Sequence, residues 1–131
     1  MRPLRVATHA RGEVPIVIDS LGELEHLLHD FDVRHKGCPT LLFLGRDPEA
    51  EAAIGLGADK AYLCLTSDFG RKVRHSLTRG PIGIDTVWFR CGEHDNEVSS
   101  KNLVDTESAI SAAICWAEDG SVDRRLDWEA E

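Results

Sequence analysis

The hydrophobic pattern of the first third of the chain predicts two strands followed by one helix. Residues 4–8 alternate weakly between apolar and polar side chains, which predicts an edge strand, and the β-branched segment 14–18 predicts a second strand. Leucines then recur at helical spacing and predict a helix over residues 20–31. Ser20 and Glu23 have the spacing of a capping box, which places the beginning of this helix.

Apolar runs in the middle of the chain predict about four successive strands. The run at 40–44 is continuously apolar and is expected to be a central strand. Further strands are predicted at 60–66, 71–77 and 85–90, and residues 52–56 are either a short strand or a turn of helix. Between and after the strands, we expect a turn at 67–70, a loop at 79–83 and a polar turn at 91–96.

The last part of the chain contains the second predicted helix. An apolar stripe at positions i, i+3, i+4 and i+7 predicts a helix over 106–118, capped by Asp105 or Thr106. Asp119 and Gly120 are expected to end it, and a short last strand is predicted over 125–128.

This order of elements predicts a fold of the α+β class. Short turns between the middle strands favour an antiparallel meander of about five to six strands, with the two helices packed on one face. The 131 residues, at 14.5 kDa, predict a single domain spanning residues 1–131. The composition, 42% hydrophobic and 29% charged, is typical of a globular protein rather than a disordered one.

The chain shows no sign of export or of membrane insertion. Its first residues contain no apolar run of signal-peptide length, and no segment approaches the roughly 20 apolar residues of a membrane span. We therefore expect a cytoplasmic protein without a membrane partner. The four cysteines include no close pair, so we expect free, mostly buried thiols.

The net charge lies entirely in the last 39 residues. Residues 93–131 hold 11 acidic and three basic side chains, which gives −8, whereas the first 92 residues hold 12 of each sign. An acidic surface repels nucleic acid and attracts basic proteins, so this asymmetry indicates a protein partner.

Residue types suited to catalysis or metal binding occur, but not in the required patterns. His26 and His29 could share a helix face, with Asp30 or Asp32 as a further ligand, yet the helix has no H-E-x-x-H motif. We therefore predict no metal and no cofactor.

The residue types of a hydrolase catalytic triad occur in and just after a segment expected to be a polar turn. His94 and Asp95 lie near Ser99 and Ser100, but G-x-S-x-G is absent, so we predict no catalytic residue. The basic run at 71–79 has no interleaved aromatic side chain and is interpreted as a solvated strand face, so no nucleic-acid partner is expected.

Four segments of the acidic region resemble one protein family. They are residues 93–98, 104–113, 117–120 and 126–129: a polar turn with an acidic residue, the entry and body of a helix rich in small residues, a glycine, and a closing strand with tryptophan. This pattern resembles the first-numbered immunity protein family, Imm1, of bacterial polymorphic toxin systems. The order of the upstream elements is compatible with it.

The resemblance implies a non-enzymatic antitoxin. Such a protein binds a cognate toxin domain, often a nucleic-acid deaminase or a nuclease, and occludes its active site. Toxins that act on nucleic acid commonly need a basic substrate groove, which an acidic partner complements. The candidate contacts are Glu93, Asp95, Glu97, Asp127, Trp128, Glu129 and Glu131.

Two questions remain open at this point. Trp128 is either an aromatic anchor for the toxin or a core residue of the last strand, and the acids are either contacts or solvated surface. The rival functions are a small metal-dependent or hydrolytic enzyme and a regulatory interaction module. The sequence alone does not set the oligomeric state.

Overall fold

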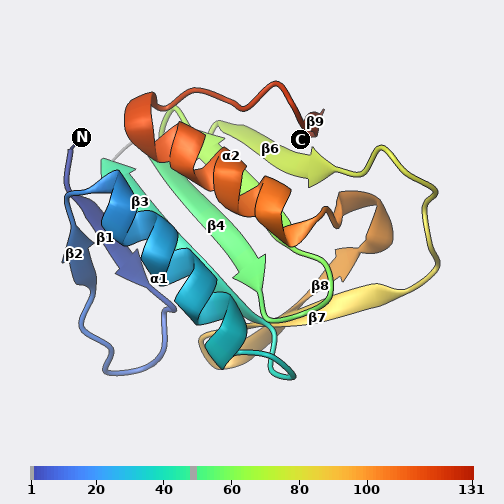
Figure 1. The fold of residues 1–131 in the computed structure, drawn as a ribbon, viewed down its shortest axis with the longest axis horizontal. Coiled ribbons are helices and arrows are strands. Elements are labelled where there is room, and N and C mark those ends of the chain that lie inside the picture. The colour runs from blue at the N-terminus through green and yellow to red at the C-terminus, as the bar shows by residue number, and fades with distance from the viewer. Residues whose placement is uncertain (1, 48–49) are drawn as a thin grey trace.

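Two helices lie side by side on one face of a large sheet in the computed structural model, which describes residues 2–47 and 50–131 (Figure 1). The strands are β1 (Leu4–Ala7), β2 (Ile16–Ile18), β3 (Thr40–Asp47), β4 (Ala50–Leu56), β5 (Tyr62–Ser67), β6 (Lys72–Leu77), β7 (Thr86–Cys91), β8 (His94–Ser99) and β9 (Asp127–Ala130). The helices are α1 (Leu21–Arg34), the short 3-10 helix η1 (Ser100–Asn102) and α2 (Thr106–Asp119). The predicted α+β class is confirmed.

Most strands form one continuous antiparallel path in the order β2-β1-β3-β4-β5-β6-β9. The hairpin of β7 and β8 leaves this path: β7 pairs with β8 and touches β3 in parallel at a single position, Thr40 opposite Arg90. In the part of the chain that the structure describes, the sheet therefore has nine strands rather than the expected five to six. No helix in the described part of the chain is long and apolar enough to cross a membrane.

Both predicted helices form, and their caps are those the sequence predicts. The Ser20 hydroxyl accepts a hydrogen bond from the Glu23 amide at 3.3 Å, and Asp105 accepts one from the Ser108 amide at 3.2 Å. α2 ends at Gly120, whose φ of 80° is the left-handed conformation typical of a glycine after a helix.

The main core lies between the helices and the sheet. Alternate side chains of the central strands, such as Leu44 and Ile54, point towards the helices and are fully buried. They meet Leu28 of α1 and Ala113 and Trp116 of α2. The stripe of α2 predicted from the sequence therefore packs in the core and accounts for folding.

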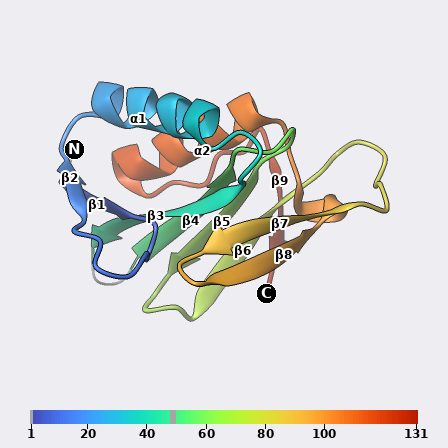
Figure 2. The same ribbon diagram turned by 90° about the horizontal axis from the view of Figure 1, so that it is seen from below.

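The β7–β8 hairpin covers the opposite face of the sheet, as Figure 2 shows from below. A second apolar cluster joins it to that face, with Phe89 at its centre, fully buried. The other buried members are Leu41, Tyr62, Val98 and Leu103. The molecule thus has three layers where the hairpin lies: helices, sheet and hairpin.

The structure corrects the expected turn at 91–96. Only Gly92 and Glu93 form the turn, and His94–Ser99 form strand β8. The strand was missed because its side chains are polar apart from Val98, so the apolar alternation that identifies a strand is absent.

Three smaller expectations also change. The strand expected at an edge over residues 4–8 is β1, and it lies inside the sheet between β2 and β3. Residues 52–56, left open as strand or helix, lie in strand β4. The four thiols are free as expected, but they are not mostly buried: Cys38 is exposed and the other three are half-buried.

Candidate functional site

The acids of the hairpin form an exposed and electrostatically unpaired group. Glu93 lies in the turn, and Asp95 and Glu97 follow on β8 with exposed side chains. None of the three forms an ion pair with another described residue; Glu97 only accepts a weak hydrogen bond from Thr86 at 3.4 Å. Their charge is therefore available to a partner.

The acids of the last strand are instead paired within the chain. Asp127 contacts Arg79 at 3.1 Å, Glu129 contacts Lys101 at 2.8 Å, and Glu131 contacts His75 at 3.2 Å. The Lys101 ammonium holds the pKa of Glu129 below its usual range. These pairs attach β9, an edge strand, to β6 and η1.

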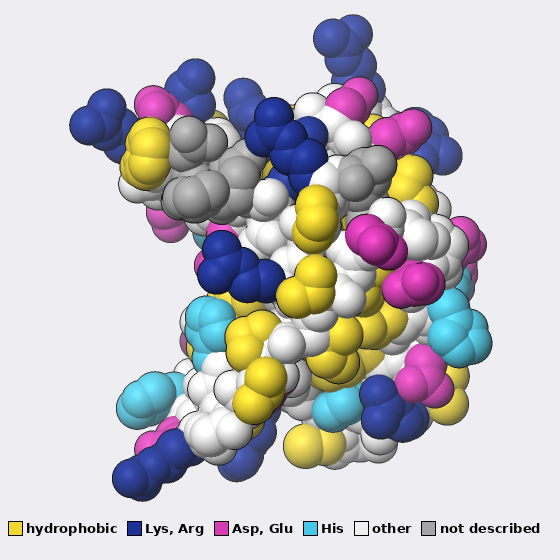
Figure 3. Space-filling view, turned by 90° about the vertical axis from the view of Figure 1, so that its left-hand side faces the viewer, with side chains coloured by type: hydrophobic (Ala, Val, Ile, Leu, Met, Phe, Trp, Pro, Cys, Tyr) yellow, Lys and Arg dark blue, Asp and Glu magenta, His cyan; other side chains and the backbone are white. Residues whose placement is uncertain are grey.

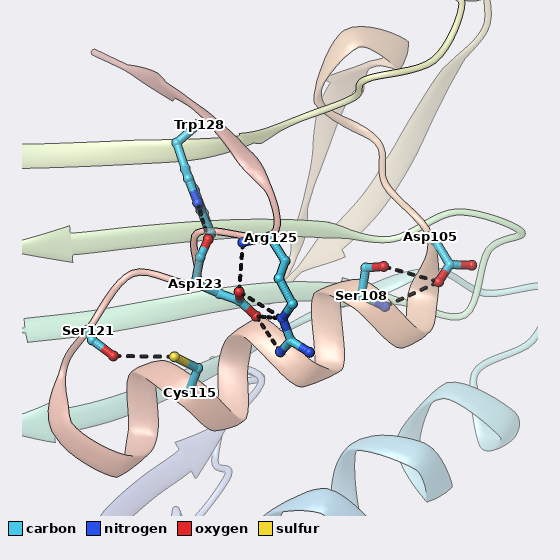
Figure 4. Close-up of polar contacts among 7 residues, drawn as sticks. All are labelled: Asp105, Ser108, Cys115, Ser121, Asp123, Arg125 and Trp128. Atoms are coloured by element: carbon cyan, nitrogen blue, oxygen red, sulfur yellow. Dashed lines mark hydrogen bonds and ion pairs between the residues drawn. The ribbon is translucent and has the colours of Figure 1, made fainter.

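Trp128 lies against the main core rather than in open solvent. Its ring is half-buried, and its indole N–H donates to the carbonyl oxygen of Asp123 at 2.9 Å (Figure 4). The nearly buried Asp123 carboxylate accepts hydrogen bonds from the Arg125 guanidinium at 2.7 to 3.2 Å. That guanidinium holds the pKa of Asp123 below its usual range, so these residues fix the connection between α2 and β9.

A different tryptophan is exposed beside the hairpin acids. Trp88 of β7 is 56% exposed and stands directly opposite Glu97, while Arg90 stands opposite Asp95. Sequence reasoning missed Trp88 as a candidate. Strand alternation would have identified it: Phe89 faces the sheet, so its neighbour Trp88 faces outwards.

The sheet is hollowed beside the hairpin, and the hollow forms the notch at the left of Figure 3. It encloses about 540 Å³, and its floor includes Phe43, on which the His9 ring stacks at 3.8 Å. Phe69 stands at its rim with 69% exposure. Its φ of 55° is uncommon for a bulky residue and belongs to the tight turn between β5 and β6, in which Asp68 and Gly70 also have positive φ.

The hollow adjoins the tip of the hairpin. A Cβ added at Gly92 would lie 2.8 Å from the His9 carbonyl oxygen, so the hairpin turn packs closely on the loop between β1 and β2. Glu93, His9 and Phe43 therefore belong to one continuous surface.

A second, polar groove brings the two groups of acids together. It encloses about 310 Å³ between β8 and the end of the main sheet, with Glu97 on one side and Glu129 on the other. Tyr62 and His75 also line it, joined by a hydrogen bond of 2.5 Å between the Tyr62 hydroxyl and the His75 Nδ1. Burial raises the pKa of Tyr62, which keeps its hydroxyl protonated.

Residues 12–130 match the family model described as Immunity protein Imm1. The chain belongs to the Imm1 immunity protein family. The match covers both helices and every strand except β1. No curated protein matches the chain. Membership of Imm1 supports an immunity role and implies a cognate toxin as the partner.

In this Imm1 chain the rival metal site is not assembled. His26 is exposed, and His29 lies near Glu25 at 4.0 Å and Glu107 at 3.5 Å. Among residues 2–47 and 50–131, no group of three or more His, Cys, Asp or Glu side chains is placed to hold a metal ion.

The residues of the suggested triad are also dispersed. His94 and Asp95 are consecutive on β8, so their side chains point to opposite faces of the strand. The Ser100 hydroxyl donates to the Gly83 carbonyl oxygen.

The basic run on β6 is partly used inside this Imm1 fold. Arg79 pairs with Asp127, and His75 lies between Tyr62 and Glu131. Lys72 and Arg74 remain exposed on a strand, which fits the solvated face expected from the sequence.

Proposed function

We propose that this Imm1 protein neutralises its cognate toxin by direct binding through the outer face of the β7–β8 hairpin. The observation that carries the proposal is the combination on that face of exposed Trp88 with Glu93, Asp95 and Glu97, none of which is ion-paired to a described residue. The toxin is proposed to be a deaminase or nuclease that acts on nucleic acid. Its active site is occluded when the complex forms.

The physical argument is one of complementary charge around an aromatic anchor. An enzyme that acts on nucleic acid commonly has a basic groove, and unpaired carboxylates that enter it mimic the phosphates of the substrate. Such charges speed association, while a tryptophan buried at the centre of an interface supplies much of the affinity. Trp88 and its carboxylate neighbours provide both on one hairpin.

The proposal also divides the predicted contacts into two roles. Glu93, Asp95 and Glu97 are proposed as primary contacts because their charges are unpaired. Asp127, Glu129 and Glu131 are proposed as secondary contacts, since each is already paired within the chain. Of these three, Glu129 lines the polar groove. Trp128 is proposed to support the last strand, with Trp88 taking the role of anchor.

The immunity role is tested by co-expression with the toxin domain encoded by the adjacent gene. Growth should be rescued, and the two proteins should purify together. To test occlusion, a catalytically inactive toxin variant is offered a labelled single-stranded oligonucleotide. Free toxin should bind the oligonucleotide and the complex should not. Rescue without loss of oligonucleotide binding would contradict occlusion while leaving the immunity role in place.

The contact surface is tested by charge reversal. Reversing Glu93, Asp95 and Glu97 to lysine should slow association with the toxin at least about tenfold at low salt and should flatten its salt dependence. The matched control reverses three exposed acids on the helix side of the molecule, Glu25, Asp30 and Glu118, with the same change in net charge. If both triple variants lose the same on-rate, net charge alone governs association and the hairpin is not the contact.

The anchor is tested separately. Trp88→Ala should weaken toxin binding about thirtyfold or more, mostly through faster dissociation, because truncation of a central aromatic side chain commonly costs about 2 kcal/mol or more. Its thermal unfolding should change little, since Trp88 is largely exposed. Wild-type affinity in this variant would remove the outer face of β7 from the interface.

A further inference from the structure

The edge of β8 that faces away from β7 is not paired with another strand. One hydrogen bond shows which backbone N–H and C=O groups of β8 point towards this edge. Residues opposite each other in an antiparallel pair alternate between hydrogen-bonded and non-hydrogen-bonded pairs. The Arg90 amide donates to the Pro39 carbonyl oxygen at 2.8 Å, so Arg90 faces away from β8 and forms a non-hydrogen-bonded pair with Asp95.

The alternation then fixes the rest of the strand. Glu97 and Ser99 lie two and four positions beyond Asp95, so they also direct their amide and carbonyl groups away from β7. Asn96 and Val98 direct theirs towards β7. Ser99 is also the cap residue of η1, so its carbonyl oxygen accepts the first hydrogen bond of that short helix. The other outward groups have no partner in the paired strands or in the described turns, loops and side chains. β8 is therefore an edge with free amides at Asp95, Glu97 and Ser99 and free carbonyls at Asp95 and Glu97.

Space for another chain lies along this edge. Residues 96–99 of β8 line the polar groove of about 310 Å³, and the opposite side of the groove is formed by Lys101, Asn102 and Glu129. Side chains that can hydrogen-bond therefore line both sides of the place where an added strand would lie.

We propose that β8 binds an extended, basic segment of the toxin as an additional strand of the sheet. This inference rests on the proposed function and specifies how the toxin is held: by backbone hydrogen bonds to Asp95, Glu97 and Ser99, with basic side chains opposite the carboxylates. Strand addition of this kind takes affinity from the backbone and specificity from alternate side chains.

Charge decides between a toxin segment and a second copy of this chain. Pairing β8 with itself would place Asp95 and Glu97 near the same acids of the second copy, and like charges directly opposite each other destabilise a strand pair. A segment with lysine or arginine at alternate positions reverses the sign of these contacts. The edge is therefore suited to a basic strand.

The edges at β2 and β9 are less suited to this partner. β2 has three residues, and its exposed side chains Ile16 and Val17 are apolar (the hydrophobic band of Figure 3 lies on this side). The acids of β9 are paired with Arg79, Lys101 and His75. β8 alone among the three combines unpaired acids with a neighbouring groove.

Amide hydrogen exchange measured by NMR tests the proposal on the intact protein, free and bound to the toxin domain encoded by the adjacent gene. The amides of Asp95, Glu97 and Ser99 should exchange rapidly in the free protein and at least about tenfold more slowly in the complex. The amides of Asn96 and Val98, which face β7, serve as internal controls and should be protected in both states. A complex in which the three outward amides exchange as fast as before overturns strand addition.

Proline at position 99 provides an independent test. Ser99 has φ −65° and ψ 146°, and its side chain caps no helix, so Ser99→Pro fits the backbone while removing one outward donor. Toxin binding should weaken at least about tenfold, because the proline both removes a hydrogen bond and obstructs the strand. Ser99→Ala, which keeps the donor, should bind as the wild type does. Equal affinity of the two variants overturns the proposal.

The outcomes separate this inference from the proposed function. If no complex forms, both fail. If a complex forms and the outward amides stay unprotected, only strand addition fails. Sedimentation of the protein alone tests whether a second copy of the chain occupies the edge. A dimer in which the amides of Asp95, Glu97 and Ser99 are protected would assign the edge to that second copy and overturn the proposal of a toxin strand.

Discussion

Substituting Gly55 by alanine should displace the β7–β8 hairpin while leaving the helix side of the molecule intact. Gly55 lies in β4, and the ring of Phe89 packs directly over it. A Cβ at Gly55 would lie 2.7, 2.8 and 2.9 Å from three carbons of that ring. Carbon atoms in favourable contact lie about 3.5–4.0 Å apart, so the ring and the strand must separate by about 1 Å.

The hairpin is the part that should move. β4 is held by β3 and β5 on either side and by the helices above, whereas β7 contacts the main sheet at a single bridge and through the cluster around Phe89. Overpacking a buried contact of this kind costs about 1–3 kcal/mol, and alanine recovers about 0.5–1 kcal/mol because it restricts the unfolded chain. The net loss is about 1–2 kcal/mol, a fall in Tm of about 3–8 °C.

The assay compares Gly55→Ala with Gly45→Ala by thermal unfolding and by toxin affinity. Gly45 is a matched control in the neighbouring strand, because among the described residues its added Cβ would meet only Arg5 atoms, at 3.9 Å. Gly45→Ala should unfold at or slightly above the wild-type temperature. Adding Phe89→Leu should cost less in the Gly55→Ala background than in the wild type, since the smaller side chain relieves the clash. Equal stability and equal affinity of the two alanine variants would refute the reasoning.

Three further predictions concern the C-terminal connection. Trp128→Ala should lower the free energy of unfolding by about 2–3 kcal/mol, which is less than the loss for a fully buried tryptophan. Trp128→Phe should lower it by about 1 kcal/mol, because the indole hydrogen bond is lost. Denaturant unfolding measures both changes. Asp123→Asn should destabilise the protein by about 1–3 kcal/mol at neutral pH. Arg125 lowers the pKa of Asp123 in the folded protein. The stability difference between wild type and Asp123→Asn should therefore be complete above the unfolded pKa of about 3.9 and should shrink as pH falls through the folded pKa. Urea titrations from pH 7 to pH 2 measure this difference. The Glu129→Gln variant should associate with the toxin faster than the variant with reversed hairpin acids, because the Glu129 charge is already paired with Lys101.

The helices were predictable because their signals are local. The apolar stripe and the cap residue of each helix lie within a few positions of one another, and Ser20 and Asp105 make the hydrogen bonds that their spacing predicts. The sequence under-predicted α1 only at its end, where the helix continues to Arg34 beyond the apolar stripe.

The hairpin was predictable only in part, because its second strand faces a small cluster and solvent. Val98 is the single buried residue of β8, so no apolar alternation identifies the strand. The parallel bridge between Thr40 and Arg90 joins residues far apart in the chain, which no local pattern encodes. The sequence predicted a simple meander because short turns suggest that strands adjacent in sequence are also adjacent in the sheet.

The candidate contacts divide along a similar line. Counting charges located Glu93, Asp95 and Glu97, because net charge is visible in the sequence. The pairing of Glu129 with Lys101 and of Glu131 with His75 spans 28 and 56 residues and is a property of the folded chain. Trp88 and Trp128 are equally apolar as residues, and only their places in the sheet make one exposed and the other half-buried.

The arrangement of the cores places the proposed contact surface and most of the buried core in different parts of the molecule. Among residues 2–47 and 50–131, the helices and the main sheet share a core of 21 buried residues, whereas five buried residues hold the hairpin. Local opening free energies follow the buried contacts that must be broken, so the hairpin should open at a lower cost than β3, β4 or β5. Substitutions on the outer face of the hairpin are then expected to change the proposed toxin contacts without disturbing the main core. A change such as Gly55→Ala is expected to alter binding through the position of the hairpin. An immunity protein that must match one particular toxin is served by this division, since its contact residues can differ while the packing under the helices stays the same.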